Sequence, residues 1–529
     1  MQITADLSRK RWRLLLPLGG ALTACTLIFS SLGFLQWLSM APALIYLFYR
    51  LERGDYRLHR LYGLGFLYFY PFYLVNWHWF IDLYPMEFAG ITEGAALALI
   101  AICWFGMSLL QTIFSALMFP VVGGLLRVRF FVDRKYLLPF LFASVYTVSE
   151  WSQTLTWAGV PWARLALGQV DCGVFFNSAA LFGSYFISFS IVAVCGLIAY
   201  AVLHTDRVKL AAICGAAVVL LNLGAGSLGY ALAQSGDGEA VKVAAVQANI
   251  GSHGKWNEKG DPYKTYESHI KAAAEAGAEL IVLPETFIAS SVSATSTLGR
   301  KISAWASTYR VTLICGGFYW DDAGNRYNSL FTVYPDGTIS DRVYHKQRLV
   351  PFGEFVPMRG FVETLIPPLA DMNMLSSDLT PGEESVVNDT AYGKVGALIC
   401  FDSIYEGLTL DAVRNGAEII CLSTNDSWFL DSVGVYMHHR QAQLRAVESG
   451  RYIIRSADTG ISSVIAPDGN ASSTLDPLIE GNAVATVAPR TQRTLYSYIG
   501  NAFVHLLIAA ELALVGYAVY CRLRGKRQK

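Results

Sequence analysis

Two patterns of hydrophobic and polar residues divide the chain. Continuous apolar stretches fill residues 1–237 and return within 491–529, and each is about 18 or more residues long, enough to cross a bilayer. Between them, at 238–490, short apolar runs alternate with charged helical stretches and turns. The pattern predicts an α-helical membrane domain, a separate domain outside the lipid, and a C-terminal transmembrane helix with a basic tail. Eight spans are expected, at 14–31, 32–49, 61–80, 93–120, 137–157, 174–202, 210–233 and 499–521.

The first apolar stretch allows two other interpretations. Spans one and two are joined by a short connection near Ser30 to Gly33, so they could form one long or re-entrant element. That alternative reverses every later loop against the charge pattern described next. A basic start before an apolar core is also typical of a cleaved signal peptide, but no A-x-A-like site precedes the next apolar run. We therefore expect a retained first helix and eight spans.

Basic residues occur in alternate loops of the membrane domain. Lys and Arg near span ends stay in the cytoplasm, and the loops 81–92 and 158–173 hold one basic residue between them, Arg164. Both termini are therefore expected in the cytoplasm, with the domain at 238–490 on the opposite side. The basic groups are Arg9, Lys10, Arg11 and Arg13; Arg50, Arg53, Arg57 and Arg60; Arg127, Arg129, Arg134 and Lys135; Arg207 and Lys209; and Arg522, Arg524, Lys526, Arg527 and Lys529.

Composition supports a membrane protein. The 529 residues are 53% hydrophobic and only 16% charged, which is too apolar for a soluble chain of this length. The formal net charge is zero, so the chain lacks the basic excess typical of nucleic-acid binding. Nine cysteines occur without a C-x-x-C pair, and Cys315 and Cys421 lie inside apolar strand-like runs, where we expect small buried side chains.

The segment 238–490 reads as an α/β domain. Strand-like runs are expected at 241–250, 311–320, 329–339 with a turn at Asp336-Gly337, and 417–425. An alanine-rich helix at 266–280 leads into the short strand IVLP. Alternating strands and helices over about 250 residues predict a layered α/β fold with its own core.

Three chemically useful residues follow or flank apolar runs in this domain. The stretches ELIVLPE (279–285), YHKQRLVPFGE (344–354) and VGALICFD (395–402) contain Glu285, Lys346 and Cys400. A residue placed where a buried strand stops is held rigidly while its side chain reaches a cleft. A carboxylate can take a thiol proton, a lysine can stabilise an oxyanion, and a thiolate can carry an acyl group. The three residues together favour covalent catalysis.

Each of these residues also has an ordinary structural interpretation. Alone, Glu285 fits a surface carboxylate, Lys346 fits a solvated basic loop, and Cys400 fits a buried thiol. His438 and His439 resemble a metal-binding pair, but adjacent residues of a helix point about 100° apart and no third ligand is spaced for zinc. We expect packing and surface roles for both histidines and no metal site.

At these residues the chain resembles the nitrilase superfamily, whose Glu-Lys-Cys triad falls on Glu285, Lys346 and Cys400. More narrowly, it resembles the apolipoprotein N-acyltransferase family. The resemblance implies an α-β-β-α sandwich, a second cleft carboxylate at Glu354 and a tryptophan near a lipid-binding cleft at Trp256. The motifs that carry it are LPET (283–286), LVPFGEFVP (349–357), Asn425, Asp426, Trp428 and Phe429 as ND-W-F, RAVESGR (445–451), EW (150–151) and GVPW (159–162).

The resemblance implies ping-pong acyl transfer without a cofactor. Glu285 deprotonates Cys400, whose thiolate attacks an acyl ester of a membrane glycerophospholipid, while Lys346 and the backbone N–H groups near Phe401 hold the oxyanion. The acyl group then passes from the thioester to the α-amine of the N-terminal diacylglyceryl-cysteine of an apolipoprotein. The expected setting is a monomer in the bacterial cytoplasmic (inner) membrane, multi-pass, with the catalytic domain on the periplasmic side and neither a metal nor a nucleic acid as partner.

Two departures from the family pattern leave the triad intact. Phe401-Asp402 stands where the family usually has a Tyr-Glu pair, and Arg348 stands where it usually has His. They leave open which head group and acyl position are accepted. Two alternative functions are a membrane-tethered amidase or hydrolase with the same triad, for which one anchor would suffice, and a transporter or silent lipoprotein-binding scaffold. The intact triad speaks against the silent scaffold.

Overall fold

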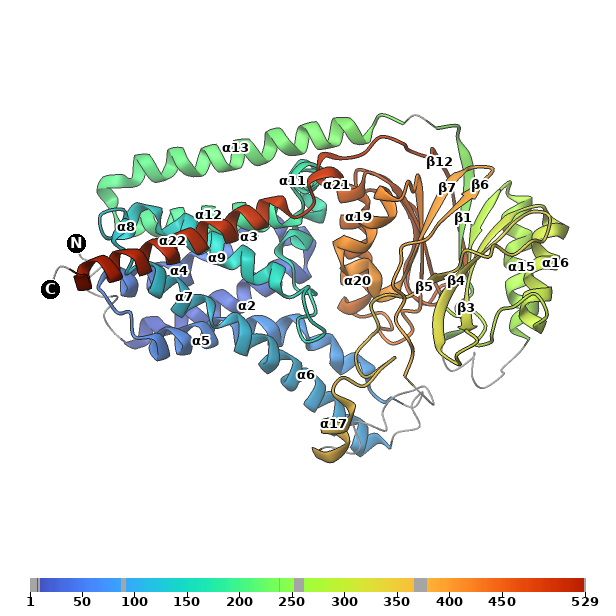
Figure 1. Ribbon diagram of the computed structural model, residues 1–529, viewed down its shortest axis with the longest axis horizontal. Helices are drawn as coiled ribbons and strands as arrows, with labels where there is room; N and C mark the ends of the chain where they lie inside the picture. The colour runs from blue at the N-terminus through green and yellow to red at the C-terminus, as the bar shows by residue number, and fades with distance from the viewer. Residues whose placement is uncertain are drawn as a thin grey trace. The chain divides into compact units, whose positions relative to one another are not determined.

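The computed structural model describes residue 7 and residues 10–86, 92–236, 238–251, 261–365 and 378–527 (Figure 1). The chain forms two compact units. A helical unit comprises Met1–Ile81, Ala98–Tyr230 and Ile499–Lys529, and an α/β unit comprises Asp82–Leu97 and Ala231–Tyr498.

The helical unit is built from helices that are apolar on nearly all sides, as expected for helices that lie in lipid or in a buried core. α12 is buried along most of its length, whereas α13 and α22 leave large apolar side chains such as Leu220 and Leu506 exposed. The α-helices are α2 Leu15–Ile28, α3 Gln36–Ser39, α4 Ala41–Glu52, α5 Leu58–Asn76, α6 Glu93–Ser115, α7 Met118–Leu125, α8 Arg129–Val132, α9 Leu138–Ser152, α10 Val174–Asn177, α11 Ala179–Phe182, α12 Ser184–Leu203, α13 Val208–Ala233 and α22 Ala502–Arg527. Short 3-10 helices are η1 Lys10–Leu14, η2 Ser30–Leu35, η3 His78–Leu83, η5 Lys135–Leu137, η6 Leu165–Cys172 and η7 Thr205–Arg207.

Among the described residues, five helical stretches are long and apolar enough to cross a membrane: Ser30–Glu52, Glu93–Leu125, Ser184–Leu203, Thr205–Ala233 and Ala502–Cys521. Three further expected spans coincide with α2, α5 and α9, of 14, 19 and 15 residues. The first two expected spans are separate helices, because the backbone is extended at Phe29. The count of eight spans stays a prediction.

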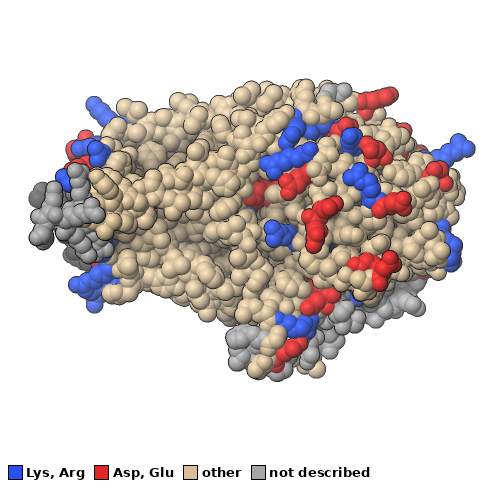
Figure 2. Space-filling view, in the orientation of Figure 1, with Lys and Arg blue, Asp and Glu red and all other residues tan. Residues whose placement is uncertain are grey.

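The surface of the helical unit differs from that of the α/β unit in charge. On the face shown in Figure 2, residues other than Lys, Arg, Asp and Glu cover the helices, and the charged side chains, mostly Lys and Arg, gather at one end of the helical unit. Charged residues of both signs are spread over the α/β unit. A nearly uncharged helical surface is what a lipid environment requires.

Two six-stranded sheets form the α/β unit, and they pack face to face. Between them lies an apolar cluster that includes Val243, Leu280, Ile314, Ile399 and Ile419. One sheet has the order β12-β1-β2-β3-β4-β5 and the other the order β11-β10-β9-β8-β7-β6. The strands are β1 Val241–Gln247, β2 Leu280–Val282, β3 Thr312–Trp320, β4 Arg326–Val333, β5 Tyr344–His345, β6 Val387–Thr390, β7 Gly393–Ile399, β8 Ile419–Thr424, β9 Tyr452–Ala457, β10 Ser462–Ile465, β11 Ala471–Leu475 and β12 Gly481–Val487.

Helices cover the outer faces of both sheets (Figure 1). α15 and α16 pack on the first sheet, where Tyr266, Ile270, Ile302 and Trp305 join one apolar core, and α19 and α20 pack on the second. The predicted α-β-β-α sandwich is confirmed. The helices of this unit are α15 Pro262–Glu275, α16 Thr297–Tyr309, α17 Arg359–Leu365, the 3-10 helix η8 Cys400–Ile404, α19 Glu406–Arg414, α20 Val433–Ser449 and α21 Leu495–Ile499.

The helices of the sandwich begin at residues suited to cap them. The Asp261 side chain accepts hydrogen bonds from the first-turn N–H groups of α15, and Pro262 follows at a position where no N–H is needed. Ser296 and Ser432 cap α16 and α20 in the same way. α20 ends at Gly450, whose φ of 65° is left-handed.

Parallel pairing in the middle of each sheet brings loop residues together. β1, β2 and β3 run parallel in one sheet, and β7, β8 and β9 run parallel in the other. The segments after β2, β7 and β8 therefore leave the sheets at carboxyl ends, where side chains from different strands can converge. Glu285, Cys400 and Asn425 lie in these segments.

Candidate active site

Glu285 lies in the turn after β2 and is buried. Its carboxylate accepts hydrogen bonds from Lys346 Nζ (2.9 Å), from Asn328 Nδ2 (2.7 Å) and from the backbone N–H of Asn425 (2.9 Å). Gly316 on β3 lets this turn approach, because a Cβ there would lie 2.9 Å from Glu285 Cα. A glutamate so enclosed is not a solvated surface residue.

Lys346 follows β5 directly, and its side chain is 2% exposed. Nζ lies 2.9 Å from Glu285 and 3.0 Å from Glu354. Burial alone lowers the pKa of Lys346, but the two carboxylates raise it well above its ordinary value, so the residue stays an ammonium. The solvated basic loop, the ordinary interpretation of this stretch, is wrong for Lys346.

Glu354, which is partly exposed, completes a cluster of three charges with the buried Glu285 and Lys346. Its Oε1 accepts from Lys346 Nζ (3.0 Å) and Asn328 Nδ2 (2.9 Å), and its Oε2 accepts from the N–H of Val350 (2.9 Å). The turn that returns Glu354 to the lysine contains Phe352 at φ 63°, a left-handed conformation that costs free energy for a side chain other than glycine. LVPFGEFVP thus folds into the turn that places this carboxylate.

Cys400 lies at the end of β7, where the strand passes into η8. Its φ of 48° is left-handed, and Ser403 Oγ donates to its carbonyl oxygen at 2.7 Å. Burial raises the pKa of the Cys400 thiol, the charge of Glu285 raises it further, and the charge of Lys346 lowers it. The net increase keeps the resting side chain a thiol, so a base must take its proton before it can attack.

Asp402 connects the nucleophile turn to the segment around the lysine. Its fully buried carboxylate accepts from Tyr344 Oη (2.8 Å), the Arg348 N–H (2.8 Å) and the Ile399 N–H (3.1 Å). Burial raises the pKa of Asp402 to about 6, against the opposing effect of the Lys346 ammonium.

Phe401 and Arg348, the two other residues at which we noted a departure from the family pattern, both contact the ring of Tyr405. The Phe401 ring packs edge-on against Tyr405 with centroids 5.6 Å apart, and the Arg348 guanidinium lies 4.9 Å from the centre of the same ring. Tyr405 ends η8. Phe401 and Arg348 thus form one packed group beside the nucleophile turn.

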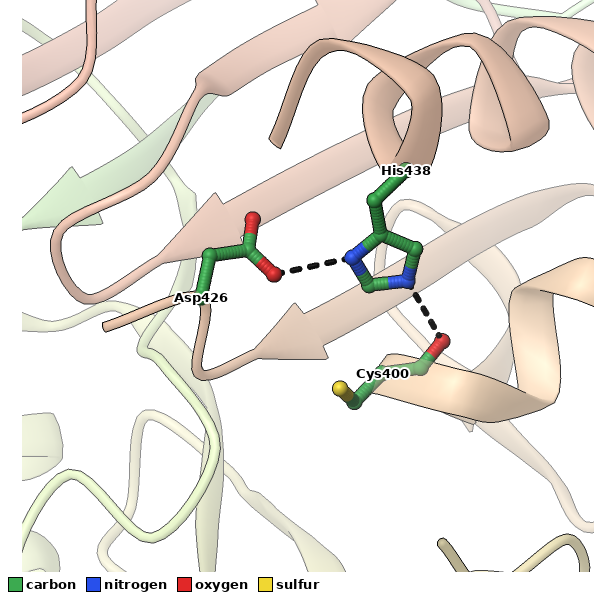
Figure 3. A group of neighbouring side chains, drawn as sticks. All are labelled: Cys400, Asp426 and His438. Atoms are coloured by element: carbon green, nitrogen blue, oxygen red, sulfur yellow. Dashed lines mark hydrogen bonds and ion pairs between the residues drawn. The ribbon is translucent and has the colours of Figure 1, made fainter. Parts of the chain in front are cut away.

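A second buried network lies behind Cys400 (Figure 3). His438 on α20 donates through Nδ1 to Asp426 (2.8 Å), and Arg455 on β9 donates to the other oxygen of Asp426 (2.7 Å). His438 Nε2 lies 3.3 Å from the Cys400 carbonyl oxygen and 3.2 Å from Ser403 Oγ. In Figure 3 the sulfur of Cys400 points away from the imidazole, so this histidine contacts the backbone of Cys400 rather than its thiol.

Cys400, Asp426 and His438 have potential metal-ligand atoms within 4.8 Å of one another. The hydrogen bonds do not suit a cation, because both oxygens of Asp426 are engaged and the Arg455 guanidinium already supplies the positive charge. Burial alone raises the pKa of Asp426, but Arg455 and His438 bring it below its ordinary value. The group is better explained as a hydrogen-bonded support.

The histidine prediction needs a correction. The expected packing role is confirmed, but the surface role is wrong, since His438 and His439 are both buried. His439 Nε2 pairs with Ser463 Oγ at 2.8 Å, and burial lowers its pKa to about 3. The spacing of these residues along the sequence also gave no indication that Cys400 and Asp426 lie close to His438 in the fold.

The remaining site predictions have mixed outcomes. Cys315 and Cys421 are fully buried, as predicted, and burial raises the pKa of Cys315 to about 12. Trp256 lies outside the described residues.

Sequence reasoning missed Asn328, which lies inside β4 and carries no motif signal of its own, although its side chain contacts Glu285 and Glu354.

Comparisons with known proteins match both parts of the chain. Residues 242–496 match the carbon-nitrogen hydrolase family model, and residues 19–197 match the model of the apolipoprotein N-acyltransferase N-terminal domain. The carbon-nitrogen hydrolase match and the α-β-β-α sandwich define a protein of the nitrilase superfamily.

Individual relatives extend this result over most of the chain. The chain is 29% identical to the apolipoprotein N-acyltransferase of Gloeobacter violaceus over 94% of this chain and 91% of the relative. It is 28% identical to that of Methylococcus capsulatus over 92% and 89%, and 31% identical to that of Allorhizobium ampelinum over 66% and 68%. The chain belongs to the apolipoprotein N-acyltransferase family.

Proposed function

We propose that this protein is an N-acyltransferase of the bacterial inner membrane that moves an acyl chain from a glycerophospholipid to the α-amine of an apolipoprotein's N-terminal diacylglyceryl-cysteine. The observation that carries the proposal is the cluster of Glu285, Lys346 and Glu354, in which Glu285 and Lys346 also act electrostatically on the strand-end thiol of Cys400. The names of its relatives support N-acyl transfer to an apolipoprotein, and the glycerophospholipid donor is part of the proposal.

In the first half-reaction Glu285 takes the proton of Cys400, and the thiolate attacks the ester carbonyl of the phospholipid. The developing oxyanion is stabilised by the Lys346 ammonium and by backbone N–H groups near Phe401. The carbon–oxygen bond then breaks, and Glu285 returns its proton to the departing oxygen. The products are a lysophospholipid and a thioester on Cys400.

In the second half-reaction the neutral α-amine of the acceptor attacks the thioester carbonyl. Glu285 takes a proton from the attacking nitrogen, the carbon–sulfur bond breaks, and the proton passes to the Cys400 thiolate. The product is an amide, and the free thiol is restored. Lys346 serves both half-reactions because it remains an ammonium beside two carboxylates.

Glu285 rather than His438 is the base in this scheme. His438 lies against the carbonyl oxygen of Cys400, and its other nitrogen is engaged by Asp426. Glu354 is proposed to hold the lysine, and Asp402 to fix the nucleophile turn. Trp256 and Phe401 are proposed as substrate-binding or supporting residues.

The apolar helices support a substrate route through lipid. We propose that 1–237 and 491–529 are the membrane domain and 238–490 the catalytic domain on the periplasmic side, with both termini in the cytoplasm. A cleft supplied from the bilayer would receive two lipid substrates while water, the competing nucleophile, is restrained.

The decisive experiment separates acyl transfer from hydrolysis. With phospholipid alone, the enzyme is expected to release one equivalent of lysophospholipid per active site and then stall. A diacylglyceryl-cysteine peptide with a free amine should restart release, and the same peptide with an acetylated amine should not. Continuous release without an amine, or rapid turnover of short soluble amides, would instead identify a membrane-tethered hydrolase.

A further inference from the structure

Asn328 forms hydrogen bonds with all three charged residues of the cluster, Glu285, Lys346 and Glu354. It lies inside β4 with 4% of its surface exposed. Its side-chain nitrogen donates to Glu285 Oε1 at 2.7 Å and to Glu354 Oε1 at 2.9 Å. Its backbone carbonyl accepts the N–H of Lys346 at 2.8 Å. One residue therefore contacts both carboxylates and the backbone of the lysine.

These contacts determine the orientation of the amide. A side-chain amide carries two N–H donors on nitrogen and only acceptors on oxygen. The two short contacts of Nδ2 are both to carboxylate oxygens, so each N–H serves one carboxylate. Turning the amide over would place its oxygen against Glu285 and Glu354, which is repulsive.

The cluster has an electrostatic problem that this amide addresses. Glu285 and Glu354 share one ammonium, that of Lys346; Glu285 is buried, and the Glu354 side chain is 13% exposed. Two carboxylates with one cation retain a net negative charge, and buried like charges favour uptake of a proton. A proton held between them would leave Glu285 unable to accept the proton of Cys400. The two N–H groups of Asn328 stabilise both ionised forms without adding charge.

We propose that Asn328 is a positioning residue that keeps Glu285 and Glu354 from sharing a proton, so that Glu285 is a competent base at neutral pH. The inference rests on the proposed acyl transfer through Cys400, and it adds a residue that acts through the carboxylates. The charged and titratable groups that face one another in this cluster are Glu285, Glu354, Lys346, Cys400, Asp402 and Asp426.

The test measures formation of the Cys400 acyl thioester in a single turnover against pH. N328L removes both N–H donors. In this variant the acidic limb of the rate–pH profile should move to higher pH by about one unit, because the carboxylates release their shared proton only at a higher pH. In N328D, which keeps the side-chain size but adds a third carboxylate, it should move further. Activity lost at pH 7 should partly return at higher pH in both variants.

Asn388 offers a matched control. It is also a buried asparagine of the α/β unit, and it donates to Thr332 Oγ1 and to the Arg342 carbonyl oxygen, each at 3.1 Å. N388L should lower thermal stability by a similar amount and leave the acidic limb in place.

The outcomes separate the two proposals. Absence of a Cys400 adduct in the unaltered enzyme at every pH would overturn the proposed function. A normal adduct in the unaltered enzyme, with N328L and N328D reduced in amplitude but unshifted in pH, would overturn the role of Asn328 alone. If N328L fails to fold, the size-matched N328D decides the question by the same shift.

Discussion

Tyr344 Oη donates a hydrogen bond to Asp402 Oδ2 at 2.8 Å, and this bond joins the strand before Lys346 to the turn at Cys400. Asp402 also accepts the N–H groups of Arg348 and Ile399, so one buried carboxylate holds both segments.

Asp402 should give stability a recognisable pH dependence. Burial raises its pKa from 3.8 to about 6, so folding favours its protonated form. Its contribution to the free energy of unfolding is full below pH 4 and is lost as pH rises through 6, a change of roughly 3 kcal/mol. Thermal unfolding of the full chain in detergent, measured from pH 4 to 7, should show this trend relative to D402N, which cannot titrate. The exposed D411N is the control, and equal pH slopes for all three proteins would contradict the assignment.

The network behind the nucleophile should prove structural and independent of metal. D426N leaves the fully buried Arg455 guanidinium without its anionic partner, and breaking a buried ion pair in this way costs about 3–5 kcal/mol. A large drop in thermal stability is expected, whereas D431N at an exposed position should have little effect. Treatment of the unaltered protein with a chelator should change neither stability nor thioester formation. A chelator-sensitive enzyme restored by zinc would show that Cys400, Asp426 and His438 hold a cation.

Cys400→Ser should abolish turnover and remove the thioester-linked acyl adduct from the purified protein. A serine hydroxyl has a far higher pKa than a thiol, and His438 is directed at the backbone rather than at this side chain. Intact-protein mass spectrometry after incubation with phospholipid measures the adduct. C421S, at a cysteine buried in β8, should keep it. Acyl groups found on Cys315 or Cys421 would contradict the choice of nucleophile.

Strand-end residues of this site were predictable from sequence, and its supporting residues were not. Glu285 and Cys400 follow apolar runs that form β2 and β7, so hydrophobic pattern alone placed them at carboxyl ends. Asn328 occupies the interior of β4, where a polar residue normally indicates only an alternating strand. Its role depends on contacts with residues 43 and 26 positions away, which no local period encodes.

The fold shows the same division between local and long-range information. The expected helix at 266–280 exists, but Asp261 and Pro262 start it earlier, and the chain turns out of it after Glu275. The run expected at 329–339 contains the predicted turn at Asp336 and Gly337, but its strand begins earlier, at Arg326, and ends at Val333. Which strands become neighbours in the two sheets depends on long-range pairing, and the sandwich followed from family resemblance rather than from periodicity.

Topology offers a prediction that needs no enzyme activity. If Lys and Arg mark the cytoplasmic side, a cysteine introduced at exposed Asp336, beside the turn at Gly337, should react in intact cells with a thiol reagent that cannot cross the inner membrane. A cysteine introduced at Arg129 should react only after the membrane is permeabilised, because that position lies in a basic loop. Both should be made in a background in which the partly exposed cysteines Cys25, Cys103, Cys172, Cys214 and Cys521 are replaced and Cys400 is retained, so that thioester formation reports a folded enzyme. Labelling at Arg129 but not at Asp336 in intact cells would reverse the orientation and place the catalytic domain in the cytoplasm, away from the diacylglyceryl-cysteine acceptors that the proposed reaction requires.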